Sequence, residues 1–95
     1  MPTFATLARF TPEARKNIED IGKAFEEGRK MAEEMGIKPI GAYATLGPYD
    51  MMLIYEAPDE KVAAGMSMSF RGQTETWTLI PMEEFTKLAA EVEEK

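Results

Sequence analysis

The chain has 95 residues, a net charge of −6, and neither cysteine nor histidine. Its length predicts one domain over residues 1–95, and area scaling predicts about 5,500 Å² of exposed surface for a compact monomer. The missing residues exclude disulfides, triads built on histidine and zinc sites with the usual ligands, while the acidic balance argues against nucleic acid, whose phosphates bind Lys and Arg. We therefore expect no metal and no cofactor.

The first predicted strand is Thr3–Phe10, a segment rich in apolar and β-branched residues. A helix start follows directly. Thr11 supplies a capping hydroxyl, Pro12 occupies the first helical position, and Glu13 places a negative charge in the first turn.

The helix that follows is too long for the strand beside it. A continuous helix from Pro12 to Met35 would be about 36 Å long, whereas an eight-residue strand spans only about 27 Å. We therefore expect a break at Asp20 and Gly22, and a left-handed cap at Gly36. The predicted inner face of this helical region carries Ile18, Ile21, Phe25, Ala32 and Met35.

The rest of the chain predicts three strands and two helices. Strands at residues 37–45 and 50–56 flank a tight connection at residues 46–49, and Pro39 suits an edge strand. A helix at residues 60–70 follows, then a turn at Arg71 and Gly72 and a strand at residues 73–80. The last helix starts at Pro81, and its apolar residues Phe85, Leu88, Ala89 and Val92 recur at helical spacing.

This order of elements defines the fold class. We predict an α+β domain of the ferredoxin-like βαββαβ kind, with a four-stranded antiparallel sheet, both crossover helices on one face, and an additional C-terminal helix. The opening residues lack the pattern of a signal peptide, and no segment approaches the ~20 apolar residues of a membrane helix. We therefore expect a cytoplasmic protein with no membrane partner.

The other face of the sheet is expected to remain open. A four-residue hairpin loop puts Tyr43 opposite Met52, and it leaves the small Ala42 and Ala44 on the face that helices cover. The expected open face is too apolar for water, so we predict a dimer or larger homo-oligomer through it. Its expected residues are Gly41, Tyr43, Thr45, Asp50, Met52, Ile54 and Glu56, together with Phe4, Thr6, Ala8, Thr74, Thr76 and Thr78.

The segment Thr45–Asp50 (TLGPYD), the apolar strand after it and residues 56–59 (EAPD) resemble the signature of the GYD-domain family. The opening residues 1–11 and residues 74–76 are similar too, so the resemblance spans nearly the whole chain. It implies a ferredoxin-like domain of the dimeric α+β barrel group. It supplies no activity and no catalytic residues that can be transferred to this chain.

A small-ligand site is predicted near the 46–49 turn. Asp50 lies at a strand edge and Tyr43 lies two residues deeper on the neighbouring strand, between apolar walls. Turn chemistry explains Gly47, Pro48 and Asp50 equally well, because Gly and Pro set the backbone angles and Asp bonds nearby amides. The predicted ligand-binding residues are Thr6, Tyr43, Tyr49, Asp50, Met52 and Ile54.

Other candidate side chains also have two interpretations. Tyr43, Tyr55 and Trp77 can line a pocket or can be core and interface aromatics. Arg9 can hold a carboxylate or phosphate bidentately, or it can form an ordinary surface ion pair. The other sheet acids that can face a pocket are Glu56 and Glu75.

Three functions remain open. The leading hypothesis is an oligomeric small-molecule-binding or regulatory module without catalysis, which fits the missing His and Cys. The second is a cofactor-free isomerase or monooxygenase acting on a small, partly apolar compound, with Asp50, Tyr43 or Tyr49 transferring protons. The third is a structural assembly protein. A carboxylate with a raised pKa in a closed cavity would favour the enzyme.

Overall fold

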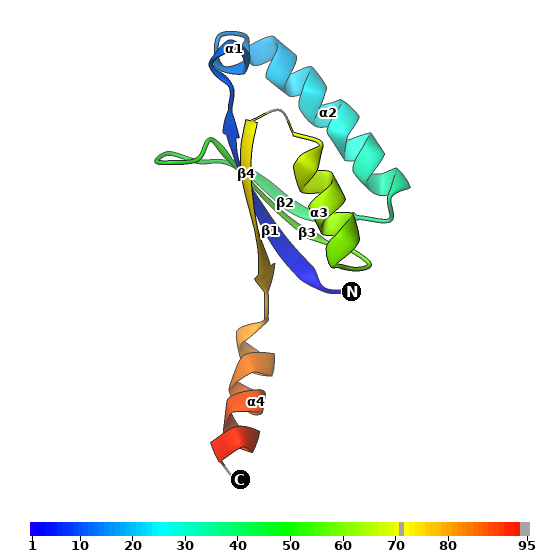
Figure 1. The fold of residues 1–95 in the computed structure, drawn as a ribbon, viewed down its shortest axis with the longest axis vertical. Helices are drawn as coiled ribbons and strands as arrows, with labels where there is room; N and C mark the ends of the chain where they lie inside the picture. Colours follow the sequence, from blue (N-terminus) through cyan, green and yellow to red (C-terminus); the bar gives the residue numbers. More distant parts are fainter. Residues whose placement is uncertain (71, 94–95) are drawn as a thin grey trace.

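The computed structural model describes residues 1–70 and 72–93, with every side chain among them except that of Ile18. Four antiparallel strands form one sheet in the order β2-β3-β1-β4, and α2 and α3 lie on the same side of it (Figure 1). This arrangement confirms the predicted ferredoxin-like class. The elements are β1 (Thr3–Phe10), α1 (Pro12–Arg15), α2 (Ile18–Glu34), β2 (Lys38–Ala44), β3 (Met51–Glu56), α3 (Glu60–Met68), β4 (Gly72–Leu79) and α4 (Met82–Glu93).

The helical region after β1 begins as predicted but breaks earlier. The Thr11 hydroxyl accepts a hydrogen bond from the Ala14 amide at 3.2 Å, which caps α1. The break predicted at Asp20 and Gly22 was wrong, because α1 ends at Arg15 and Asn17 is non-helical (φ −134°, ψ 81°). Asparagine favours non-helical backbone conformations, because its side chain can bond to nearby backbone groups. One glycine inside a long helix lowers its stability by only about 1 kcal/mol.

Gly36 and Asp59 adopt the helix-ending and helix-capping roles that their residue types favour. Gly36 has φ +80° and ends the turn after α2 in the left-handed conformation. Asp59 accepts a hydrogen bond from the Val62 amide at 2.9 Å and caps α3. Arg71, half of the predicted turn before β4, lies outside the described residues, and Gly72 has φ +138°.

The core lies between the sheet and the helices α2 and α3. Phe4 and Tyr55 stack with their ring centroids 5.9 Å apart, and both side chains are buried. Along the inner face of α2 only Ala32 is buried among the described side chains, while Phe25 and Met35 are 36% and 39% exposed. The side chain of Ile18 lies outside the described residues. The core cluster consists of Phe4, Ala32, Ile37, Tyr55, Ala57, Ala63 and Met66.

A cluster of hydroxyl groups fills the centre of this core. The Thr6 side chain is completely buried, and its Oγ1 lies 2.7 Å from the Tyr55 hydroxyl and 2.9 Å from Thr76 Oγ1. Ser67 of α3 lies against the same two threonines, with its Oγ 3.5 Å from Thr6 Oγ1. Each buried hydroxyl therefore has a partner inside the protein, which offsets the cost of removing it from water.

The pairing of the strands confirms the predicted open face along β2 and β3 and corrects it along β1 and β4, while Thr45 and Asp50 lie outside the paired segments. Tyr43 pairs with Met52 and Gly41 with Ile54, as predicted, with an irregularity between Pro39 and Gly41. The assignments on β1 and β4 were wrong, since a slip of one residue exchanges the two faces of a strand and no short turn fixes β1 against β3. The residues that lie instead on the helix-covered face are Phe4, Thr6, Ala8, Thr74, Thr76 and Thr78.

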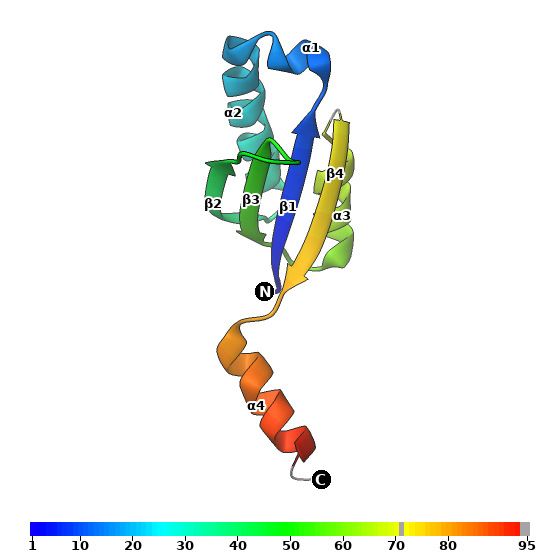
Figure 2. The ribbon, with the colours of Figure 1, turned by 90° about the vertical axis from the view of Figure 1, so that its left-hand side faces the viewer.

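The chain exposes more surface than a compact monomer of its size. Its accessible area is 7,327 Å², which exceeds the predicted value of about 5,500 Å². Its radius of gyration is 15.6 Å, where a compact domain of this length has about 12 Å. The cause is α4, which continues beyond the end of β4 and points away from the sheet (Figure 2). Within the described residues, no helix has the length and apolar character required to cross a membrane.

The hydroxyl cluster gives a stability prediction. Thr6→Val removes the partner of the Tyr55 hydroxyl and leaves it buried and unbonded, so the free energy of unfolding should fall by about 1–3 kcal/mol. Adding Tyr55→Phe should recover part of this loss, because no orphaned hydroxyl then remains. Urea denaturation of both single variants and the double variant measures the coupling. Strictly additive losses would contradict this account.

Candidate functional site on the open sheet face

One face of the sheet has no helix of residues 1–70 or 72–93 over it. We call it the open sheet face, and paired residues in the four strands define its membership. Tyr43 and Trp77 are 56% and 45% exposed there, while Ala5 and Leu7 of β1 are buried between their neighbours. Apolar and aromatic side chains thus dominate a surface in contact with water. The open sheet face consists of Thr3, Ala5, Leu7, Arg9, Gly41, Tyr43, Met52, Ile54, Glu56, Gln73, Glu75, Trp77 and Leu79.

The connection between β2 and β3 lies against one end of this face. The Thr45 amide donates to the Asp50 carbonyl at 3.0 Å, and the Thr45 hydroxyl donates to the Tyr49 carbonyl at 2.6 Å. Gly47 has φ +120°, a conformation that glycine adopts without strain. The Asp50 amide donates to the Ala8 carbonyl at 2.9 Å, so the connection is tied to β1. It therefore presents Tyr49 to the open sheet face.

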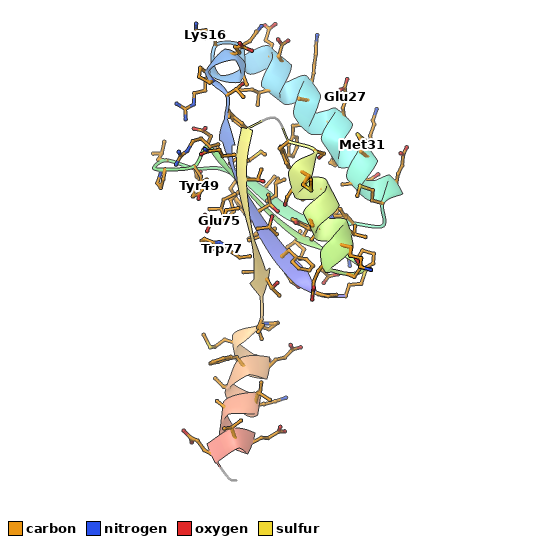
Figure 3. All side chains as sticks on the ribbon, viewed as in Figure 1. Lys16, Glu27, Met31, Tyr49, Glu75 and Trp77 are labelled. Atoms are coloured by element: carbon orange, nitrogen blue, oxygen red, sulfur yellow. The ribbon has the colours of Figure 1, made fainter. Side chains whose placement is uncertain are left out.

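Tyr49, Glu75 and Trp77 form a hydrogen-bonded chain on this face. The Tyr49 hydroxyl and the Trp77 indole N–H, the latter at 3.0 Å, each donate to one oxygen of the Glu75 carboxylate. All three side chains lie on the side of the sheet opposite α3 (Figure 3). These donors lower the pKa of Glu75, and the hydrogen bond to Glu75 raises the pKa of Tyr49. Glu75 is thus held as a carboxylate and Tyr49 as a neutral phenol.

On the same face, Arg9 holds the connection between β2 and β3 against β1. Its Nε donates to the Pro48 carbonyl at 2.8 Å, and its Nη1 donates to the Gln73 side chain at 3.3 Å. Its guanidinium lies 5.5 Å from the centre of the Tyr49 ring, in cation–π contact. Arg9 thus binds a carbonyl and a ring, neither the bidentate anion nor the ion pair that the sequence suggested.

Asp50, predicted on the open face, lies at the end of the sheet and joins three elements. Its Oδ2 accepts a hydrogen bond from the Phe10 amide at 2.8 Å and lies 3.0 Å from Nη2 of Arg15 in α1. The Phe10 amide, followed by Arg15, lowers the pKa of Asp50. The carboxylate therefore ties the start of β3 to the end of β1 and to α1, and in this state it is a poor base at neutral pH.

The predicted ligand-binding residues do not form one group. Tyr43, Met52 and Ile54 share the open sheet face, and Tyr49 lies at its edge. Thr6 lies on the opposite face, inside the core, and therefore cannot contribute to the same site. The ligand-binding role of the others stays a prediction.

The combination of Arg9, Glu75 and Trp77 with Tyr49 was not predicted from the sequence. The signal that links these residues is the alternation of Glu75 and Trp77 along β4. That signal can be used only once the register between β1 and β4 is known, because Leu7 pairs with Glu75 and Arg9 with Gln73.

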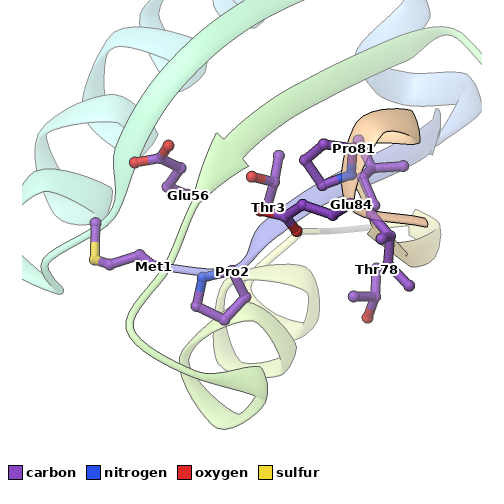
Figure 4. Close-up of a pocket in the computed structure, with 9 residues that line it drawn as sticks. Met1, Pro2, Thr3, Glu56, Thr78, Pro81 and Glu84 are labelled. Atoms are coloured by element: carbon purple, nitrogen blue, oxygen red, sulfur yellow. The ribbon is translucent and has the colours of Figure 1, made fainter. Parts of the chain in front are cut away.

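A concave region lies where β4 leads into α4. It is an open cleft of about 360 Å³ between the start of β1 and the end of β4 (Figure 4). Glu56 and Glu84 line it from opposite sides, and Pro2 and Pro81 contribute apolar surface. Across residues 1–70 and 72–93, no three acidic side chains gather closely enough to hold a metal ion.

The sheet order, the one-sided helices and the aromatic open face define a ferredoxin-like α+β protein. The model of the GYD domain family matches residues 4–89, and the chain therefore belongs to this family. A protein from Thermus thermophilus, described as "Glutamine synthetase and cystathionine beta-lyase binding protein", is 29% identical over 82 residues. The match covers 83% of this chain and 86% of that protein. No solved structure matches the chain.

The position of Asp50 predicts a pH-dependent effect on stability. Because its pKa is lowered on folding, its stabilising contribution is present at neutral pH and is lost as pH falls below about 4 through the folded pKa. Asp50→Asn should therefore lower the urea midpoint at pH 7 and change it less at pH 3, as followed by Trp77 fluorescence.

Asp59→Asn is the matched control for this measurement. Asp59 caps α3 through a backbone amide, and asparagine caps a helix about as well as aspartate. Its urea midpoint at pH 7 should stay close to that of the wild type. An unchanged midpoint for Asp50→Asn would show that Asp50 acts only through turn contacts that asparagine reproduces.

Proposed function

We propose that this chain is a non-catalytic binding module that self-associates through its open sheet face and regulates other proteins by binding them. The observation that carries the proposal is the open sheet face itself. Tyr43, Met52, Ile54 and Trp77 lie there on three of the four antiparallel strands, and no helix of the described residues covers them. An apolar surface of this kind is typical of an interaction site.

A second copy is the partner that fits this face best. Two sheets pack face to face about 10 Å apart when their inner side chains interdigitate, and a two-fold axis lets the same face serve both copies. The polar chain of Tyr49, Glu75 and Trp77 can enter such an interface, because both oxygens of Glu75 already accept a hydrogen bond. This assembly would be of the dimeric α+β barrel type.

Binding to other proteins is supported by the Thermus thermophilus relative. Its name states that it binds glutamine synthetase and cystathionine beta-lyase, and its match to this chain covers most of both proteins. The net charge of −6 favours partners with basic surface regions. We therefore propose metabolic enzymes as the class of partner.

The carboxylate and phenol named for proton transfer argue against the enzyme hypothesis. Asp50 has a lowered pKa and is bound to Arg15 and the Phe10 amide, and Tyr49 has a raised pKa and donates to Glu75. A general base or acid at neutral pH requires shifts in the opposite directions. These observations support binding without catalysis.

Self-association predicts the effect of a charge on the open sheet face. Ile54→Lys places an ammonium in the proposed interface, so the dissociation constant should rise at least about tenfold. Ala42→Lys is the matched control, because Ala42 is exposed on the other face of the sheet. Sedimentation velocity measures both constants, with circular dichroism to verify the fold. A monomeric wild-type protein at micromolar concentration would contradict the proposed interface.

Partner binding predicts a direct interaction with two enzymes. Glutamine synthetase and cystathionine beta-lyase from the same organism should bind the immobilised chain with micromolar or tighter affinity, and binding should change their rates. Biolayer interferometry and enzyme assays provide the measurements. No binding to either enzyme, together with a small molecule retained in native mass spectrometry, would favour the small-molecule hypothesis instead.

A further inference from the structure

The helix α4 has an apolar stripe that the described residues leave uncovered. Phe85, Leu88 and Val92 are 52%, 58% and 67% exposed, and Met82 extends the stripe at 71%. Glu83, Lys87 and Glu91 occupy the other side of the helix, and Glu84 and Glu93 flank the stripe. Over its described length α4 has no buried residue. A stripe of this width is typical of a helix that packs against a surface.

The helix needs such a surface to be stable. Isolated helices of about 12 residues are marginal in water, because propensity alone barely repays the cost of nucleation. The sheet and the helices α1 to α3 do not supply the cover, since α4 leads away from them beyond Pro81 (Figures 1 and 2). Within the described residues, the stripe is therefore free to pack on another molecule.

The exposed area is large enough for a standard interface. The chain exposes about 1,800 Å² more than a compact monomer of its mass. A standard interface buries about 800 Å² on each partner. The excess, which the projecting helix α4 causes, is thus larger than the area that a standard interface buries on one partner.

The position of α4 favours a second copy of this chain as the cover. β4 contributes Trp77 to the open sheet face and leads through Leu79 and Ile80 directly into α4. Leu79 lies on the open sheet face beside Thr3, and Ile80, 61% exposed, carries apolar surface from there to the start of α4. A copy that lies on the open sheet face is therefore the molecule next to α4.

We infer that α4 is a docking arm whose apolar stripe packs on the second copy of the chain. The inference rests on the proposed self-association through the open sheet face, and it extends the interface from the sheet to the helix. Symmetry makes each copy donate one arm and receive one, so the contact is made twice in a dimer.

The test uses one cysteine per variant, since the chain itself has none. Ala89→Cys places an environment-sensitive fluorophore beside the stripe, and Ala90→Cys places the same fluorophore toward the charged side of α4. The single tryptophan, Trp77, reports independently on the open sheet face. All three emissions are followed while the full chain is diluted from high to low micromolar concentration.

On dilution the dimer dissociates, and we expect the emission of Trp77 and of the label in Ala89→Cys to move to longer wavelength together. The emission of the label in Ala90→Cys should shift little. A shift of Trp77 without a shift of the stripe label overturns the docking arm and leaves the sheet interface intact. A shift of neither probe contradicts both proposals. A stripe label that shifts only when glutamine synthetase or cystathionine beta-lyase is added assigns α4 to a different protein and also overturns the inference.

Two charge variants measure the contribution of the arm. Leu88→Glu should raise the dissociation constant of the dimer at least about tenfold, whereas Lys87→Glu, with the same new side chain on the neighbouring position, should change it less than about threefold. Lys87→Glu changes the net charge by two and Leu88→Glu by one, so an effect of Lys87→Glu equal to or larger than that of Leu88→Glu would mean that net charge, and not the stripe, controls association, and would overturn the docking arm.

Discussion

The two crossovers of the fold place both of their helices on the same face of the sheet. A right-handed connection leaves β1 and returns through α2, another returns through α3, and neither reaches the opposite side. A four-stranded sheet therefore has one face buried by its own chain and one face that needs an external partner. The hydroxyl cluster, the aromatic surface and the projecting helix all follow from this division.

Polar side chains on the two faces of the sheet have different kinds of hydrogen-bond partner. On the helix-covered face, the hydroxyl of Thr6 and its neighbours bond to one another in a closed set that requires no water. On the open sheet face, Glu75 keeps its charge but receives a donor at each oxygen from Tyr49 and Trp77. The carboxylate is thus prepared for a surface that loses its water on assembly, without the cost of an unbonded charge.

Most of the fold could be predicted from local patterns, because strand alternation, capping residues and left-handed glycines act over a few residues. The register of β2 against β3 also followed from a short loop. The faces of β1 and β4 could not be obtained in this way, since their registers depend on packing between distant segments, and Thr6 was assigned to the wrong face as a result. The break at Asn17 shows a related limit, because a glycine is only a weak helix breaker when the surrounding turns are well formed.

The edges of the sheet differ in a way that limits how the chain can grow into larger assemblies. On the β2 edge, Pro39 lacks an N–H group and the irregularity between Pro39 and Gly41 disturbs the spacing of the ladder, so an added strand finds few partners. The β4 edge carries no proline over Gly72–Leu79. Strand addition is therefore favoured at the β4 edge. Two chains that paired through their β4 edges would leave only their β2 edges exposed, which disfavours further growth into a fibre.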